Sequence, residues 1–450
     1  MTTVPNESGL KRELSAAQQA MMALGGALGT GLFLASGLSV NVAGPAVVFS
    51  YVIVAAVSLL LGKALADMAV AHPTAGAFGV YAGMYISPFA GYAVRVSYWL
   101  AEVIATGAQL VAASIYMAYW FPTVPGALWV LAFAIVLIYA NSRDVGHLGA
   151  IEYWLVTIKI AAVALFVIVA VLVITGLMGE PAIGFRNLTA HGGFAPYGIQ
   201  GVWLGCCFVI YSFIGVEIVG VTSGEAEDPA RTIPRAMRRM VFGLSTIYIV
   251  TIVLLLALTQ WNQLGMGESP FVSVLRRLGI PGAAGVMNFV VLSAALSSSN
   301  ANLYLIARTT FSLARAGFVP KALGEVTRRG APMNALIVSG LGLGAAVIVR
   351  ALWPDSAYVW FFGVALFGAL FVWLMIFVTH IAFRRAAVPI GSCVGALMIA
   401  AILVSTWWVP GLKSTLIAGG PWLLLLAIGY RLSRASETRA ATAANYESRS

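Results

Sequence analysis

Long apolar stretches, separated by short polar segments, recur along the whole chain. A helix needs about 20 mostly apolar residues to cross the hydrocarbon core of a bilayer. Twelve stretches come close to that length or exceed it. The pattern therefore predicts an all-α membrane protein with 12 transmembrane helices, near residues 19–38, 43–62, 97–119, 124–141, 151–177, 197–224, 240–261, 283–307, 333–349, 356–382, 388–409 and 414–430.

Composition excludes a soluble protein. Hydrophobic residues make up 60% of the chain and charged residues only 9%, whereas about a quarter of a soluble domain is charged. The net charge of +10 does not indicate a nucleic-acid partner, because the basic residues form short clusters between the apolar stretches. Their expected partner is the lipid bilayer.

The basic residues also predict an orientation. Most of the 26 Lys and Arg residues fall on the side that both ends of a twelve-helix chain would share, and this side is cytoplasmic by the positive-inside rule. We therefore expect a multi-pass protein of the inner (cytoplasmic) membrane. Residues 1–18 would form a cytoplasmic N-terminal tail, residues 19–430 the transmembrane domain, and residues 431–450 a cytoplasmic C-terminal tail. The first apolar stretch has no small-residue cleavage pattern, so we expect a retained helix and not a cleaved signal peptide.

Two predicted helices carry glycines at mid-membrane. The first contains Gly25–Phe33 (GGALGTGLF) and the sixth contains Tyr211–Glu217 (YSFIGVE). If spans 1–5 and 6–10 form inverted halves, these two helices correspond to each other, and paired interruptions of this kind mark the binding site of a transporter. Unwound backbone is tolerated there only where it lines a cavity.

Broken helices present both kinds of backbone group to a ligand. The N–H groups at the start of a half-helix favour a carboxylate, and the carbonyl groups at the end of the other half favour an ammonium. An α-amino acid carries both charges on one carbon. The pattern indicates a site for an amino acid, although other small zwitterions satisfy the same physics.

Several motifs resemble the amino-acid permeases of the amino acid, polyamine and organocation (APC) superfamily, in particular its bacterial amino acid transporter branch. They are Gly25–Gly37 (GGALGTGLFLASG), Tyr211–Met237, Glu152–Ile160 (EYWLVTIKI), Pro270–Val272, Met287–Leu303 and Ser312–Lys321 (SLARAGFVPK). The resemblance implies the LeuT-type fold, in which two inverted repeats of five helices, with helices 1 and 6 broken, are followed by two further C-terminal helices. It implies one substrate site between helices 1, 3, 6, 8 and 10.

The resemblance also assigns roles to residues of the two broken helices. The break at Gly29, Thr30 and Gly31 would hold the substrate carboxylate. Carbonyl groups from Ser212 to Ile214 would hold its amine, and the aromatic residues Tyr211 and Phe213 would cover the ligand. Many relatives carry an acid in helix 3 where this chain has Gln109, so the role of that acid does not transfer directly. Gln109 is nevertheless a candidate residue of the substrate pocket.

Three charged residues lie well within predicted helices, namely Glu102, Lys159 and Glu217. Such residues typically mark substrate or ion pathways, because inserting one costs at least about 2.5–3.5 kcal/mol. We expect all three to act in coupling or gating. Each has a structural alternative: Glu102 pairs with Lys159 or an arginine, Lys159 is a permanently charged strut paired with a carboxylate, and Glu217 caps or pairs helices.

We draw further expectations for Glu102 and Lys159. Glu102 lies seven residues before Gln109 and on roughly the same helix face, and one interpretation is that it contacts a polar substrate side chain. The resemblance implies that Lys159 stands where sodium-coupled relatives hold sodium, which favours protons as the coupling ion. A sodium site would instead use the polar residues of helix 8, which otherwise form hydrogen bonds between helices: Ser297, Ser298, Ser299, Asn300 and Asn302.

Other functional classes lack support in the sequence. There is no GxxxxGK[ST] phosphate loop and no HExxH motif, so we expect neither ATP-driven transport nor an enzyme, and no metal or cofactor. The predicted function is secondary active transport of amino acids by proton symport with alternating access. Alternatives are amino acid exchange, sodium symport and, more remotely, a transporter-like amino acid sensor.

Segments outside the spans give three smaller predictions. Asp67–Gly91 is expected to be a cytoplasmic loop, and His380, at a span end, an interface residue. The acidic residues Glu225, Glu227 and Asp228, followed by Arg231, Arg235, Arg238 and Arg239, predict a cytoplasmic connector. That connector is either a plain solvated loop or an inner gate closed by ion pairs.

Overall fold

A computed structural model describes residues 28–72, 77–142, 145–178, 181–218, 229–265, 267–315, 317–325, 327, 332–385 and 387–447. The predicted N-terminal tail, Gly25 and Gly26 of the first glycine motif, and the acidic part of the connector at 225–228 lie outside these residues.

The regular elements of the described residues are helices. Nine helical stretches are long and apolar enough to cross a membrane, and two shorter apolar helices accompany them at Gly126–Asn141 and Gly198–Phe213. The α-helices are α2 (Ser36–Ala43), α3 (Val47–Ala71), α4 (Ala77–Tyr85), α5 (Pro88–Met117), α6 (Gly126–Asn141), α7 (Val145–Ile174), α8 (Gly198–Val209), α10 (Pro229–Leu258), α11 (Pro270–Arg277), α12 (Ala283–Arg315), α13 (Met333–Leu352), α14 (Ala357–Phe383), α15 (Ile390–Ser405) and α16 (Lys413–Glu447).

The first two predicted helices form one apolar stretch of 41 residues, Gly31–Ala71. Within it the chain bends between α2 and α3 at Gly44, whose φ is 64°. A Cβ atom at Gly44 would lie 2.4 Å from the Pro196 ring, so only glycine fits this bend. The remaining described helices follow the predicted order, and twelve membrane crossings stay a prediction.

Hydropathy locates the helices well but their ends poorly. α5 begins nine residues before its predicted start, where Pro88 occupies the first turn and the Ser87 hydroxyl accepts a hydrogen bond from the Ala90 N–H at 3.1 Å. Serine caps and first-turn prolines favour helix starts whatever their hydropathy. α10 and α16 likewise extend past the apolar stretch, into the basic segment before residue 240 and into the predicted C-terminal tail.

The predicted loop at Asp67–Gly91 is wrong. Asp67 lies inside α3, and Ala77–Tyr85 forms α4, which packs on the start of α5. A Cβ atom at Gly91 would lie 2.9 Å from the Cα of Gly83. Small residues let two helices approach this closely, so Gly83 and Gly91 form a contact between α4 and α5.

The prediction of His380 as an interface residue is also wrong. Its side chain is buried. The ring shares a hydrogen bond with Ser392 of α15 at 2.7 Å and lies 3.4 Å from the Asp67 carboxylate of α3. His380 therefore connects three helices, and its position near the end of a span gave no sign of these partners.

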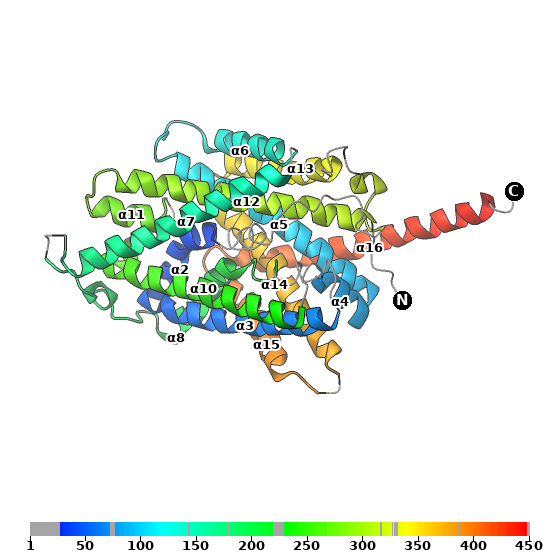
Figure 1. Cartoon of the computed structure of the whole chain (residues 1–450), viewed down its shortest axis with the longest axis horizontal. Coiled ribbons are helices and arrows are strands. Elements are labelled where there is room, and N and C mark those ends of the chain that lie inside the picture. The colour runs from blue at the N-terminus through cyan, green and yellow to red at the C-terminus, as the bar shows by residue number, and fades with distance from the viewer. Residues whose placement is uncertain are drawn as a thin grey trace.

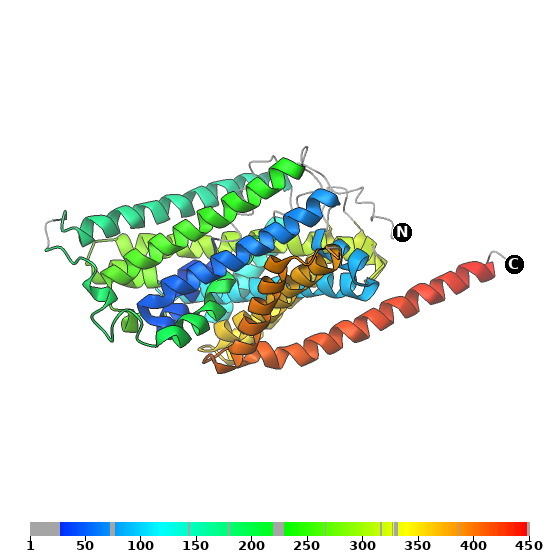
Figure 2. The same cartoon turned by 90° about the horizontal axis from the view of Figure 1, so that it is seen from below.

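α5 is the central helix of the bundle. It packs against α4, α6, α12, α13, α14 and α16. Of its most apolar segment, 83% of the residues are buried, compared with 28% in the corresponding segments of α7 and α15. Figures 1 and 2 show α7, α10 and α3 side by side on one flank and α15 and α16 on another, with α16 projecting beyond the other helices. The buried helices α5, α12 and α14 surround the site described next.

Candidate functional site

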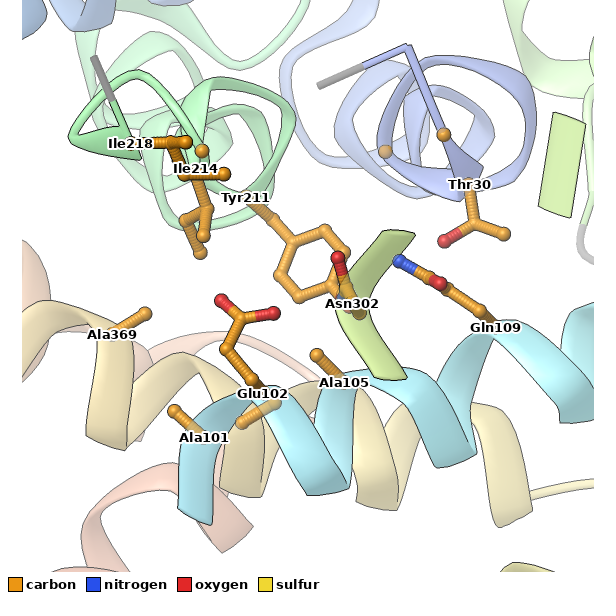
Figure 3. Close-up of a pocket in the computed structure, with 14 residues that line it drawn as sticks. Thr30, Ala101, Glu102, Ala105, Gln109, Tyr211, Ile214, Ile218, Asn302 and Ala369 are labelled. Carbon is orange, nitrogen blue, oxygen red and sulfur yellow. The ribbon is translucent and has the colours of Figure 1, made fainter. Parts of the chain in front are cut away.

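A pocket lies in the middle of the bundle, where five helical segments converge (Figure 3). The walls come from the start of η1 (Gly31–Ala35), from α5, from the end of α8, from α12 and from α14. The lining residues are Gly29, Thr30, Gly31, Ala101, Glu102, Ala105, Gln109, Tyr211, Ile214, Gly215, Ile218, Asn302, Ala365 and Ala369.

One wall is the glycine motif of the first predicted helix. The chain bends at Leu28 and Gly29, enters helical geometry at Thr30, and continues as the π-helical turn η1. The Phe33 N–H donates to the Gly29 carbonyl at 3.4 Å. A π turn is wider than an α turn and is frequent at functional sites, so the backbone of Gly29–Gly31 meets the pocket in an irregular conformation.

The facing wall is the end of α8. The helix tightens into the 3-10 turn η4 (Ile210–Phe213), Ile214 is extended with ψ 134°, and Gly215 has a φ of 107°. That positive φ requires glycine. The Ser212 carbonyl accepts a hydrogen bond from the Tyr248 hydroxyl of α10 at 2.8 Å, and this bond holds the end of the helix in place.

The two walls touch each other. A Cβ atom on Gly31 would lie 2.8 Å from the Ser212 Cα and 2.9 Å from its Oγ. Such distances leave no room for any residue but glycine at position 31. The irregular segments of the first and sixth predicted helices therefore meet through direct backbone contact beside the pocket.

The third wall is one face of α5. Glu102 and Gln109 both point into the pocket with Ala105 between them (Figure 3). The Gln109 Oε1 accepts a hydrogen bond from the Ser299 hydroxyl of α12 at 3.1 Å. Because the Gln109 oxygen faces Ser299, the Gln109 amide nitrogen points toward Thr30 (Figure 3). The two side chains thus form a donor end and an acceptor end of one pocket.

Tyr211 separates these two ends. Its ring lies between Glu102 and Asn302 in Figure 3 and packs on Phe362 of α14, with ring centroids 4.3 Å apart. The hydroxyl is buried, with no hydrogen-bond partner in the part of the chain that the structure describes. Tyr211 thus presents an aromatic ring to whatever enters the pocket.

Two of the three charged residues lie outside the lining. Lys159 of α7 is fully buried, with its ammonium 3.5 Å from the Ser298 hydroxyl of α12. Glu217 is also buried, and its Oε2 accepts hydrogen bonds from the Gly215 N–H at 3.0 Å and from the Trp373 indole N–H at 3.2 Å. Glu217 thus links the irregular segment that follows η4 to Trp373 of α14.

The structure brings together most of the residues that the sequence singled out. Seven line the pocket: Gly29, Thr30, Gly31, Glu102, Gln109, Tyr211 and Ile214. Ser212 and Phe213 lie behind that lining, where the Phe213 ring packs on Tyr248 with centroids 5.3 Å apart. Three polar residues of α12 contact three different partners. Ser298 contacts Lys159, Ser299 contacts Gln109, and the Asn300 side-chain oxygen accepts a hydrogen bond from the Asn141 amide at 2.8 Å.

Sequence reasoning missed the small residues of the pocket. Ala365 and Ala369 of α14 and Ala101 and Ala105 of α5 line it, each pair spaced by four residues. That spacing places small side chains on one helix face and was the signal available. Asn302 was expected either to ligate sodium or to form a hydrogen bond between helices, and the structure places it in the pocket lining.

Comparison with known proteins identifies the family. The family model described as amino acid permease matches residues 18–434, which is most of the chain. The chain belongs to the amino acid permease family of the APC superfamily. This permease is 33% identical to the uncharacterized amino acid permease YtnA of Bacillus subtilis over 438 residues, which cover 94% of this chain and 95% of the relative.

A second relative is named for its transport activity. The permease is 34% identical to the aromatic amino acid transport protein AroP of Escherichia coli K12 over 434 residues, with 94% of this chain and 95% of the relative covered. These relatives are transport proteins and not enzymes. Together with the apolar helices, the family makes the permease an integral membrane protein of amino acid transport.

Proposed function

We propose that this permease is a secondary active amino acid transporter that couples uptake to protons and works by alternating access. The observation that carries the proposal is the meeting of two interrupted segments, Gly29–Gly31 and Tyr211–Gly215, at one pocket among the most buried helices. Irregular backbone at mid-membrane is stable only where a cavity or a ligand satisfies its polar groups.

The backbone of the two segments would recognise the part that all α-amino acids share. N–H groups at Thr30 and Gly31, together with the Gln109 amide, would bind the carboxylate. Carbonyl groups at the end of η4, from Ser212 to Ile214, would bind the ammonium. Tyr211 would cover the bound ligand, supported from behind by Phe362, and Phe213 would hold the end of η4 against Tyr248.

Alternating access would follow from the arrangement of the two halves. We propose 12 spans, of which the first ten form two inverted repeats of five around the pocket and the last two are additional. Both tails, residues 1–18 and 431–450, would be cytoplasmic, since most Lys and Arg residues would then face the cytoplasm of a bacterial inner membrane.

Coupling would reside in Lys159, outside the substrate pocket. Its ammonium contacts Ser298 of α12, the helix that also supplies Asn302 to the pocket. A lysine that gives up its proton as access changes would link α7 and α12 to the proton gradient. Glu217, which already accepts two N–H groups, would hold the interrupted end of α8 instead of carrying the proton.

Transport in liposomes tests both transport and coupling. We expect purified protein to accumulate a labelled amino acid when an inward proton gradient is imposed. In Lys159→Ala the accumulated amount of labelled amino acid should fall at least tenfold. The variant should still exchange labelled for unlabelled amino acid, because its substrate pocket is intact. Lys63→Ala, which removes an exposed lysine of α3, is the matched control and should behave like the wild type.

Three results would contradict the coupling mechanism. Uptake that requires sodium and does not depend on the proton gradient would show that sodium, and not the proton, is the coupling ion. A strict requirement for internal unlabelled amino acid would identify an exchanger. Full accumulation by Lys159→Ala would remove Lys159 from the mechanism.

A further inference from the structure

Glu102 carries the one charged side chain among the residues that line the pocket. The residue is only 6% exposed, and its carboxylate points into the pocket beside Tyr211 (Figure 3). Within the described part of the chain, the structure gives this carboxylate no hydrogen bond and no ion pair. A buried carboxylate without a partner is costly, and a ligand that donates to it or brings a positive charge would remove that cost.

The nearby ionisable residues do not fill that role. The Lys159 ammonium contacts Ser298, outside the lining, and Glu217 is itself an acid that accepts from Gly215 and Trp373. The Thr106 hydroxyl donates to the Glu102 backbone carbonyl at 2.7 Å and not to its carboxylate. No Lys, Arg or His is among the lining residues.

The surroundings of Glu102 differ from those of Gln109. Seven residues of α-helix separate the two, a rise of about 10 Å. The Gln109 end holds Thr30 and the glycine backbone, whereas the Glu102 end is walled by Ala101, Ala105, Ala369, Ile214 and Ile218. A ligand that spans the pocket must therefore carry its zwitterion at one end, an apolar stem in the middle and a polar group at the far end.

Charge balance narrows the choice of that polar group. The charges of a neutral amino acid cancel at the backbone end and leave the Glu102 carboxylate unpaired. A basic amino acid brings one additional positive charge on a chain of methylene groups. The stem would pack on the alanines and the Tyr211 ring, which also attracts a cation.

We propose that Glu102 recognises the substrate side chain and that the substrates are basic amino acids, such as lysine, arginine and ornithine. This assignment rests on the proposed function, because it assumes that the α-amino and α-carboxyl groups bind at the two interrupted segments. It adds the selection of the side chain, which backbone groups cannot provide.

Pairs of ligands that differ in charge alone test the assignment. Binding to the purified full-length permease is measured by titration calorimetry for arginine against citrulline and for lysine against norleucine. We expect each basic member to bind at least tenfold more tightly than its neutral partner. Glu102→Gln should abolish this ratio, and Glu325→Gln, which alters an exposed acid, should preserve it.

The outcomes separate this proposal from the proposed function. Equal binding of citrulline and arginine to the wild type, or tighter binding of phenylalanine and tryptophan, would overturn basic specificity and leave amino acid transport standing. An unchanged ratio in a folded Glu102→Gln variant would overturn the role of Glu102. Failure of every amino acid to bind or accumulate would overturn both. The wild-type ratios decide the substrate class even if the variant does not fold.

Discussion

At the scale of single residues, Gly31 is the point where the two interrupted segments touch. Any larger residue would place its Cβ atom 2.8 Å from the Ser212 Cα, and a backbone atom cannot rotate away as the end of a flexible side chain can. The glycine is therefore needed for contact between the first and sixth predicted helices. Its identity is visible in the sequence, but its partner Ser212 is not.

Gly31→Ala tests this contact. Overpacking a well-packed site typically costs about 1–3 kcal/mol, and here it would also push the two pocket walls apart. We expect a lower thermal unfolding temperature and at least a tenfold loss of amino acid uptake. Gly243→Ala on α10 is the control, because a Cβ atom there meets nothing within 4 Å. Equal stability and uptake of Gly31→Ala and the wild type would contradict the packing argument.

At the scale of elements, the Glu217 carboxylate holds the irregular segment that follows α8 and η4 in place. Gly215 can take its φ of 107° because it lacks a side chain, and its N–H then points to Glu217 at 3.0 Å. The same oxygen accepts the indole N–H of Trp373 on α14. A buried acid thus connects the interrupted helix to one of the helices that line the pocket.

A double-mutant cycle measures this connection. Trp373→Phe keeps a ring but removes the indole N–H, and Glu217→Gln removes the charge. Hydrogen bonds to charged groups contribute about 1.5–3 kcal/mol, so we expect each variant to lower the thermal unfolding temperature. In the double variant the unfolding temperature should fall by less than the sum of the two single effects, because both changes act on the same hydrogen bond. Additive losses would show that the two side chains act independently.

At the scale of the whole molecule, helix position decides which residues face lipid and which face the site. Most residues of α5, α12 and α14 are buried, whereas at most 28% of the apolar segments of α7, α13, α15 and α16 is buried. Exposed apolar side chains such as Leu341, Leu397 and Leu432 lie on those outer helices. This arrangement suits a bundle whose outer helices face lipid and whose inner helices form a polar pocket.

The predicted orientation is testable on a single helix. Lys413 and Arg431 are both exposed and stand near the two ends of the apolar part of α16, about 27 Å apart at 1.5 Å per residue. In intact cells, a membrane-impermeant maleimide should label Lys413→Cys and not Arg431→Cys. Both should react after permeabilisation. The wild type, with Cys206 and Cys207 buried, gives the background. The reverse labelling pattern would place the tails outside the cytoplasm.

The long apolar helices, their order, the paired glycine interruptions and the membrane class can all be predicted from the sequence. In lipid each helix must satisfy its own backbone, so apolar length is a local property that the sequence displays directly. Both interruptions at the pocket can also be located in the sequence, because glycine destabilises the middle of a helix and its presence there marks an irregular segment.

Which side chains meet depends on how the helices pack, and it could not be predicted from the sequence. Glu102 and Gln109 could be placed on one face from their spacing, but Ala365, Ala369 and Asn302 belong to the pocket through the rotation of distant helices. The same holds for Lys159, which contacts Ser298, and for His380, which contacts Ser392 and lies beside Asp67. Packing between segments far apart in the chain fixes these partners, and hydropathy, which is read along the chain, contains no information about helix rotation.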